Sequence, residues 1–191
     1  MLYEKMKRIF DCTVAAIALV LLCPLLLCIW IMVKVTSPGP GLYWSKRVGI
    51  NSRLFSMPKF RTMRSDTPEV ATDLLDDPTR YITSIGIFLR KSSLDELPQL
   101  WNILIGDMSL VGPRPALFNQ YALVELRRAF GIDTLRPGLT GWAQINGRDQ
   151  ISDQDKVVFD NEYLLKKSFL FDLKICTLTV FKAIAREGIL H

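Results

Sequence analysis

The stretch LDELPQ (residues 94–99) places two neighbouring carboxylates, Asp95 and Glu96, just ahead of a proline. Carboxylates can serve as nucleophiles, as general acids or bases and as magnesium ligands. They are also favoured in the first turn of a helix, where they complement the positive end of the helix dipole. Ser93 and Glu96 have the spacing of a capping box, so a helix start is the simpler interpretation of the pair taken alone.

The other residues that could take part in chemistry are mostly cations. Arginine binds phosphate through a fork of hydrogen bonds. The glycines of RPGLTGWAQINGR (136–148) would let the backbone approach a ligand closely, although an ordinary glycine-rich loop explains that segment equally well. The single histidine ends the chain, so a histidine base is not expected. Cations around a carboxylate pair indicate phosphate chemistry, in which Mg²⁺ would join carboxylate and phosphate oxygens. The candidate cations are Lys59, Arg61, Arg90, Arg114, Arg136 and Arg148.

The helix that must carry the carboxylate pair is limited by Pro98, because proline is tolerated only in the first helical turn. We therefore expect this helix to begin close to Asp95 and to end at Gly106. Its apolar residues recur at helical spacing and predict one buried face. They are Leu97, Leu100, Trp101, Leu104 and Ile105.

The remaining elements are read from periodicity and turn residues. Two short β-prone runs, at 42–44 and 54–57, predict a hairpin, and 65–80 reads as a surface loop. Helices are expected over 82–91, 116–130 and 152–167, the last with Ser152 and Asp155 at its start. Residues 136–148 are expected to have little helix. Residues 168–186 alternate apolar and basic side chains, which predicts an amphipathic helix in the core or on a membrane surface, with the surface favoured.

Residues 12–33 carry no charge and are apolar enough for a membrane segment. A straight helix of this length would cross the roughly 30 Å hydrocarbon layer. Pro24 lies in the middle and should bend the helix. Basic residues flank both ends, so a span would export one basic group, against the usual distribution of Lys and Arg. A re-entrant helix and a spanning helix are about equally favoured by the residues alone, and a secretory signal is less favoured.

Composition limits the partners. The chain has 191 residues, 49% of them hydrophobic, with a mean hydropathy of +0.20 and a net charge of +5. This charge suits an anionic membrane surface or an anionic substrate. No zinc spacing, stacking motif or dense basic run indicates nucleic acid, and the four cysteines lack paired spacing. We expect one functional unit, with a membrane helix in residues 1–36 and an interfacial catalytic domain in residues 37–191.

Several longer motifs resemble those of the small monotopic phosphoglycosyl transferases, which form the bacterial sugar transferase family. The resemblance covers almost the whole chain, and the long segment around the carboxylate pair is its most specific part. Cys23 stands before Pro24, where the family often has serine. The motifs are KRIFD (7–11), the proline-broken apolar segment, PKFRTM (58–63), SLDELPQLWNILIGDMSLVGPRP (93–115), RPGLTGWAQINGR (136–148) and FDLK (171–174).

This resemblance implies an α+β, mostly helical monotopic membrane protein with a proline-kinked re-entrant helix, a small β-hairpin and interfacial amphipathic helices. It implies transfer of a phosphosugar from a UDP-sugar to polyprenyl (undecaprenyl) phosphate, with release of UMP, as the initiating membrane step of glycoconjugate synthesis. The expected place is the cytoplasmic face of the bacterial inner membrane, in contact with its lipids, and a homodimer is compatible with the family.

The family pattern also implies roles for single residues. Asp95 would be the nucleophile that forms a covalent phosphosugar ester, and Asp95 and Glu96 are the expected catalytic residues and Mg²⁺ ligands. The role of Glu96 stays open between orienting the metal, supporting Asp95 and only capping the helix. Arg90 would neutralise the polyprenyl phosphate and Arg114 the nucleotide diphosphate. Further substrate contacts are expected from Lys59, Arg61, Arg136, Gln144, Arg148 and Asp172.

Two other functions remain open at this point. In a membrane phosphohydrolase, water instead of a lipid would resolve the Asp95 adduct. A non-catalytic membrane adaptor would recruit glycosyltransferases without chemistry of its own.

Overall fold

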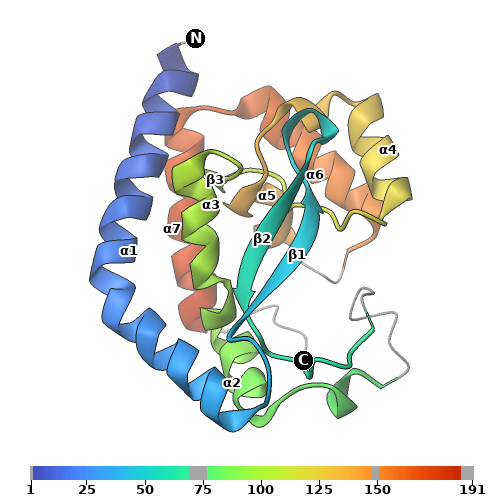
Figure 1. The fold of residues 1–191 in the computed structure, drawn as a ribbon. Coiled ribbons are helices and arrows are strands. Elements are labelled where there is room, and N and C mark those ends of the chain that lie inside the picture. Colours follow the sequence, from blue (N-terminus) through green and yellow to red (C-terminus); the bar gives the residue numbers. More distant parts are fainter. Residues whose placement is uncertain (1, 69–76, 148–150, 186–191) are drawn as a thin grey trace.

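The computed structural model of the chain describes residues 2–68, 77–147 and 151–185. In this part of the chain the protein is mostly helical and carries two small two-stranded sheets. Helix α1 (Leu2–Thr36) lies along one side of the body that the other elements form (Figure 1). The predicted α+β, mainly helical class with one long apolar N-terminal helix is confirmed.

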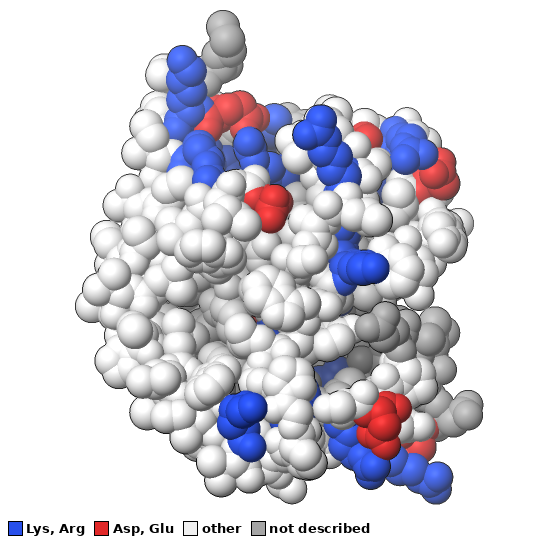
Figure 2. Space-filling model, viewed as in Figure 1, with Lys and Arg blue, Asp and Glu red and all other residues white. Residues whose placement is uncertain are grey.

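Helix α1 turns its apolar side chains outward. It is long and apolar enough to cross a membrane, and only 11% of its most apolar stretch is buried. In Figure 2 the corresponding side of the molecule carries few charged residues. Pro24 divides α1 into a first arm before it and a second arm after it. The first arm places Ala15 against Met57 and Ile103, and the second arm places Ile29 and Val33 against the body. Both arms of α1 therefore rest on the same body.

The predicted hairpin is confirmed and is longer than expected. Strands β1 (Leu42–Val48) and β2 (Leu54–Phe60) pair antiparallel, from Leu42 opposite Phe60 to Val48 opposite Leu54. The turn between them contains the 3₁₀ helix η1 (Ile50–Ser52), in which Asn51 has a φ of 52°. Asparagine tolerates this left-handed conformation better than most residues. Strand β2 carries Lys59 towards the carboxylate pair.

A second sheet was not predicted. Strands β3 (Ser109–Val111) and β4 (Gly138–Thr140) pair in parallel and bring distant segments together. Gly138 is needed at this crossing, because an added Cβ would lie 2.1 Å from the backbone nitrogen of Gly112. The short helix α5 (Trp142–Asn146) follows. The expectation of little helix over 136–148 is therefore wrong, because the pairing with β3 orders this segment.

The other helices agree with the sequence to within a few residues. Helix α2 (Ser84–Ser92) and helix α6 (Asp153–Lys166) lie where they were predicted, and the Ser152 hydroxyl accepts a hydrogen bond from the Asp155 N–H at 3.1 Å. Helix α4 (Tyr121–Ala129) begins later than expected. The remaining 3₁₀ helices are η3 (Pro78–Arg80) and η5 (Ile132–Thr134).

Helix α7 (Phe169–Ala185) uses both faces. Its inner face buries Ile175 in a cluster with Val111, Ile145 and Tyr163. Its outer face leaves Leu170 and Phe181 exposed. The helix is therefore a core element on its inner face, and contact of its exposed apolar face with a membrane surface stays a prediction.

Candidate active site

The carboxylate pair lies on a 3₁₀ helix, η4 (Leu94–Gln99), which continues into helix α3 (Leu100–Ile105). Ser93 separates η4 from α2 and has a left-handed backbone, with φ 56° and ψ 17°. The predicted capping box is wrong: a capping residue is normally extended, and the Ser93 side chain makes no cap hydrogen bond. The helix does start next to Asp95, as Pro98 required.

The buried face predicted for this helix is also wrong in part. Trp101 and Ile105 are 52% and 53% exposed, whereas Asn102 and Ile103 are buried. A 3₁₀ helix has three residues per turn and an α-helix 3.6, so η4 shifts the phase of the residues that follow. The polar side chain of Asn102 can be buried because its amide Nδ2 donates a hydrogen bond to the carbonyl of Ser56 at 3.0 Å. This bond ties α3 to strand β2.

Glu96 is the centre of an ion cluster. Its Oε1 lies 2.7 Å from Lys59 Nζ and 2.8 Å from Arg114 Nη2, while Arg114 Nη1 lies 3.4 Å from Oε2. Burial alone would raise the pKa of Glu96, but Arg114 and Lys59 hold that pKa well below its usual value. Glu96 is therefore ionised at neutral pH and positions two cations, one from the hairpin and one from the GPRP loop.

Asp95 has the opposite environment. The residue is 7% exposed, and its carboxylate accepts no hydrogen bond from the described residues. Burial raises the pKa of Asp95 to about 6. The negative charge of Glu96 adds to this rise, and the positive charges of Lys59, Arg90 and Arg114 limit it. No donor of the described residues occupies its lone pairs, which leaves them available for reaction. Near neutral pH, Asp95 is thus an ionised group suited to nucleophilic attack.

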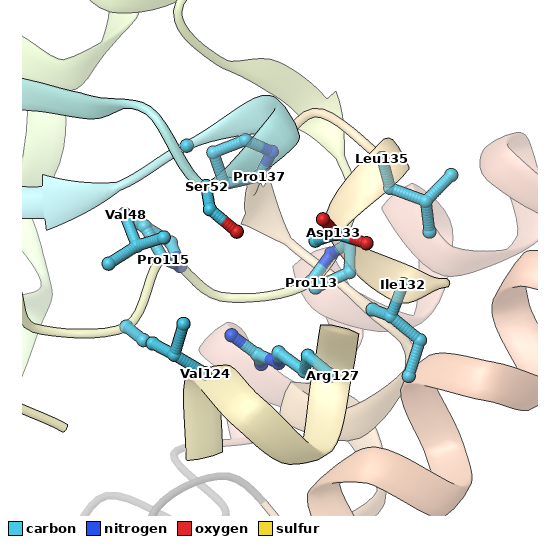
Figure 3. A pocket seen from close by; sticks show the side chains of 12 residues that line it. Val48, Ser52, Pro113, Pro115, Val124, Arg127, Ile132, Asp133, Leu135 and Pro137 are labelled. Atoms are coloured by element: carbon cyan, nitrogen blue, oxygen red, sulfur yellow. The ribbon is translucent and has the colours of Figure 1, made fainter. Parts of the chain in front are cut away.

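The backbone carbonyls of Arg114 and of the residue after it are held by two further arginines. Arg127 of α4 donates from Nη1 to the carbonyl of Arg114 at 2.8 Å, and Arg47 of β1 donates to the carbonyl of Pro115 at 3.1 Å. Asp160 of α6 accepts from Arg127 Nη2 at 2.6 Å. Figure 3 shows Arg127 beside a cavity of about 30 Å³ that is also lined by Pro113 and Pro115. Nothing in the spacing of Arg127 and Asp160 along the chain indicates that they meet.

The structure brings together Lys59, Arg90, Arg114, Asp95 and Glu96, as predicted from their types. It gives the remaining predicted residues other contacts. In the described part of the chain, these contacts are not with Asp95 or Glu96.

Arg61 donates to the carbonyl of Ser37 at 2.7 Å, at the end of α1. Asp172 accepts hydrogen bonds from Tyr3 and Lys7 at 2.8 Å each.

Arg136 donates from Nε to the carbonyl of Gly106 at 3.1 Å, and Gln144 of α5 donates to the carbonyl of Leu139 at 3.3 Å. Arg148 lies outside the described residues. Direct substrate contact by these five residues stays a prediction.

The fit of a magnesium ion depends on the donors at the pair. Among the described residues, no group of three or more His, Cys, Asp or Glu side chains could hold a metal. Mg²⁺ in phosphate chemistry needs only one or two carboxylates, with the remaining ligands from phosphate and water. Asp95 fits such a role. Glu96 fits it less well, because Lys59 and Arg114 already occupy its oxygens.

Comparison with known proteins gives a consistent result. The family model described as bacterial sugar transferase matches residues 2–186. The chain is 40% identical over 191 residues to the UDP-glucose:undecaprenyl-phosphate glucose-1-phosphate transferase of Escherichia coli (strain K12), covering 96% of this chain and 41% of that protein.

Shorter relatives match over most of their length. The uncharacterized sugar transferase EpsL of Bacillus subtilis (strain 168) is 42% identical over 184 residues, covering 96% of this chain and 90% of that protein. The exopolysaccharide production protein ExoY of Rhizobium meliloti (strain 1021) is 41% identical, covering 93% of this chain and 83% of that protein. The chain therefore spans less than half of the Escherichia coli relative and most of the other two. Matched from residue 2 to residue 186, it belongs to the bacterial sugar transferase family, which confirms the resemblance of its motifs.

Proposed function

We propose that the protein transfers a phosphosugar from a UDP-sugar to polyprenyl phosphate at a membrane surface and releases UMP. The observation that carries this proposal is a buried, ionisable Asp95 that faces the charges of three cations, on a body that rests along an apolar helix. The name of the Escherichia coli relative, which specifies a nucleotide-sugar donor and undecaprenyl phosphate, supports the same reaction class.

In the first step, a carboxylate oxygen of Asp95 attacks the β-phosphorus of the UDP-sugar. The bond between this phosphorus and the oxygen that bridges to the α-phosphorus breaks, and UMP leaves with that electron pair. Asp95 then carries the phosphosugar as an acyl phosphate ester. Arg114 and Lys59, fixed by Glu96, would neutralise the charge that develops on the former bridging oxygen as UMP leaves.

In the second step, a phosphate oxygen of polyprenyl phosphate attacks the phosphorus of the adduct. The bond from phosphorus to the Asp95 oxygen breaks, which restores the carboxylate and gives the polyprenyl diphosphosugar. The two steps together consume and release no net proton, so no general base is needed. Arg90, whose charge acts on Asp95, would neutralise the incoming phosphate.

Magnesium is proposed as the cofactor, with Asp95 as its protein ligand. When bound, it would withdraw negative charge from the diphosphate oxygens. Glu96 would act on the reaction indirectly, as the residue that positions Lys59 and Arg114.

We further propose that α1 is re-entrant and that both of its ends lie at the cytoplasmic face of the inner membrane. A helix that crossed the membrane would separate its two arms by the bilayer. Here Arg8 in the first arm donates to the carbonyl of Leu104 at 2.8 Å, and Ile29 and Val33 in the second arm pack with Phe60 and Leu89. Contact of both arms with one body supports the re-entrant arrangement.

Topology can be tested by labelling single cysteines near residues 3 and 51 in a background without the native cysteines. Labelling of both positions from the same side by a membrane-impermeant reagent is expected. Labelling from opposite sides would establish a span and refute the re-entrant proposal.

The reaction can be tested on the purified protein with Mg²⁺ and a panel of UDP-sugars. Intact-protein mass spectrometry after rapid quenching should show one added phosphosugar, and Asp95→Asn should prevent it. Added polyprenyl phosphate should then yield UMP and a lipid-linked sugar. Free sugar phosphate instead of the lipid product would indicate a phosphohydrolase, and no UMP with any donor would favour the adaptor.

A further inference from the structure

A second and larger cavity, of about 240 Å³, lies between the first three turns of α1 and the body. Its wall combines residues of α1, β3, η5 and α6 with the segment that precedes β4. The carboxylate pair and its three cations do not line it. Four basic side chains do, namely Lys7, Arg8, Arg136 and Lys167.

Two of these cations have carboxylate partners. Lys167 Nζ lies 2.8 Å from Glu4. Lys7 Nζ lies 2.8 Å from Asp172 and 3.9 Å from Asp11, so it is shared between two carboxylates.

The other two cations contact only carbonyl groups among the described residues. Arg8 donates to the carbonyls of Ile103 and Leu104, and Arg136 donates from Nε to the carbonyl of Gly106. A carbonyl accepts a hydrogen bond but does not cancel a full charge. The cavity is thus lined by four cations, whereas three carboxylates line it or pair with these cations, namely Glu4, Asp11 and Asp172. The formal charges leave a surplus of one positive charge.

The outward face of the same turns of α1 is mostly apolar and also carries the exposed Lys5. Leu2, Met6 and Ile9 are 74%, 49% and 68% exposed. Figure 2 shows basic side chains gathered at the end of the molecule where α1 begins, next to the nearly uncharged side along α1. An apolar outer face beside a basic inner cavity is the arrangement expected where a protein meets lipid headgroups.

We propose that this cavity binds the headgroup phosphodiester of an anionic phospholipid. One phosphodiester carries one negative charge and matches the surplus. The Nη atoms of Arg136, which make no hydrogen bond to the described residues, would donate to it. The site is distinct from that proposed for polyprenyl phosphate, which is a monoester of higher charge and must reach Asp95. The inference does not depend on the proposed reaction.

The test measures lipid binding by the purified full chain in a neutral detergent, titrated with phosphatidylglycerol and followed by native mass spectrometry. Wild type is expected to retain one lipid. Arg136→Gln should bind it about fivefold more weakly, the effect of one basic residue near a membrane surface. Arg136→Lys should keep most of the affinity, because it keeps the charge. Arg128→Gln is the matched control, since Arg128 is an exposed arginine on α4 that pairs with Glu125.

The outcomes separate the proposal from its rivals. Equal affinity of Arg136→Gln and wild type, or an equal loss in Arg128→Gln, would overturn the site. Equal binding of phosphatidylcholine would mean that the acyl chains, not the charge, hold the lipid, and would overturn it too. Displacement of phosphatidylglycerol by millimolar inorganic phosphate would show a site for free anions instead of a lipid headgroup. Thermal unfolding of each variant checks that a loss of binding does not reflect a loss of folding.

Discussion

Asp95→Asn is expected to abolish transfer and, at the same time, to stabilise the fold. Burial raises the pKa of Asp95 from 3.8 to about 6. Each pKa unit corresponds to about 1.4 kcal/mol, so ionised Asp95 costs the folded state about 3 kcal/mol. Asparagine has nearly the same shape and carries no charge, so it removes this cost.

The sign of the pH dependence follows from the two pKa values. Near pH 4 the unfolded chain begins to lose the Asp95 proton, while the folded chain keeps it up to about pH 6. The folded state therefore loses stability as the pH rises through this window, and the full cost applies above it. The advantage of Asp95→Asn should be complete near pH 8 and should almost vanish near pH 4.

Glu96→Gln should act in the opposite direction. It leaves Lys59 and Arg114 without the carboxylate that both contact. Loss of the charged acceptor is expected to destabilise the fold by about 1–3 kcal/mol. Two neighbouring residues of similar chemistry thus have opposite expected effects on stability.

The assay is thermal unfolding of the variants in one detergent at one heating rate. At this chain length 1 kcal/mol corresponds to about 2–4 °C, so Asp95→Asn should raise the midpoint by about 6–12 °C near pH 8. Asp66→Asn is the control, because Asp66 is an exposed carboxylate paired with Arg64 and its removal should change little. A midpoint of Asp95→Asn at or below that of wild type near pH 8 would refute the reasoning about burial.

Three further predictions address the reaction and the fold. The rate of adduct formation should rise about tenfold per pH unit below about pH 6 and level off above it, because attack requires ionised Asp95; a flat rapid-quench profile would contradict this. Asp160→Asn should lower the free energy of unfolding by about 3–5 kcal/mol, measured by thermal unfolding, because it leaves Arg127 buried without its counter-charge. Arg128→Gln, next to Arg127 on α4, should not have this effect. EDTA should stop UMP release and added Mg²⁺ should restore it; full activity in EDTA would exclude the metal.

Periodicity, turn residues and capping residues were enough to predict the elements that depend on nearby residues only. The hairpin and helices α2 and α6 were found from alternation, turn residues and a serine cap. The cluster of Lys59, Arg114 and the carboxylate pair was anticipated from residue types, because cations around a carboxylate pair indicate phosphate chemistry.

Contacts between distant segments could not be found in this way. The pairing of β3 with β4 joins segments that are separated by helix α4, and the Arg127 and Asp160 ion pair joins two helices. Neither contact is signalled by a periodic pattern or a characteristic spacing of residues in the sequence. The left-handed backbone at Ser93 was also missed, since serine gives no local signal for it. The shift in helical phase was missed because the sequence did not indicate that η4 is a 3₁₀ helix.

The way α1 is attached has a practical consequence for anyone who wants a water-soluble form of this enzyme. Ala15, Ile29 and Val33 complete two apolar clusters of the body, and Arg8 donates to two carbonyls near the end of α3, the helix that follows Asp95. Cutting the helix away would uncover both clusters and loosen that turn. A water-soluble form should instead be sought by replacing exposed apolar residues of α1, such as Val20, Leu21 and Leu27, with polar residues. The residues of α1 that pack against the body should be kept.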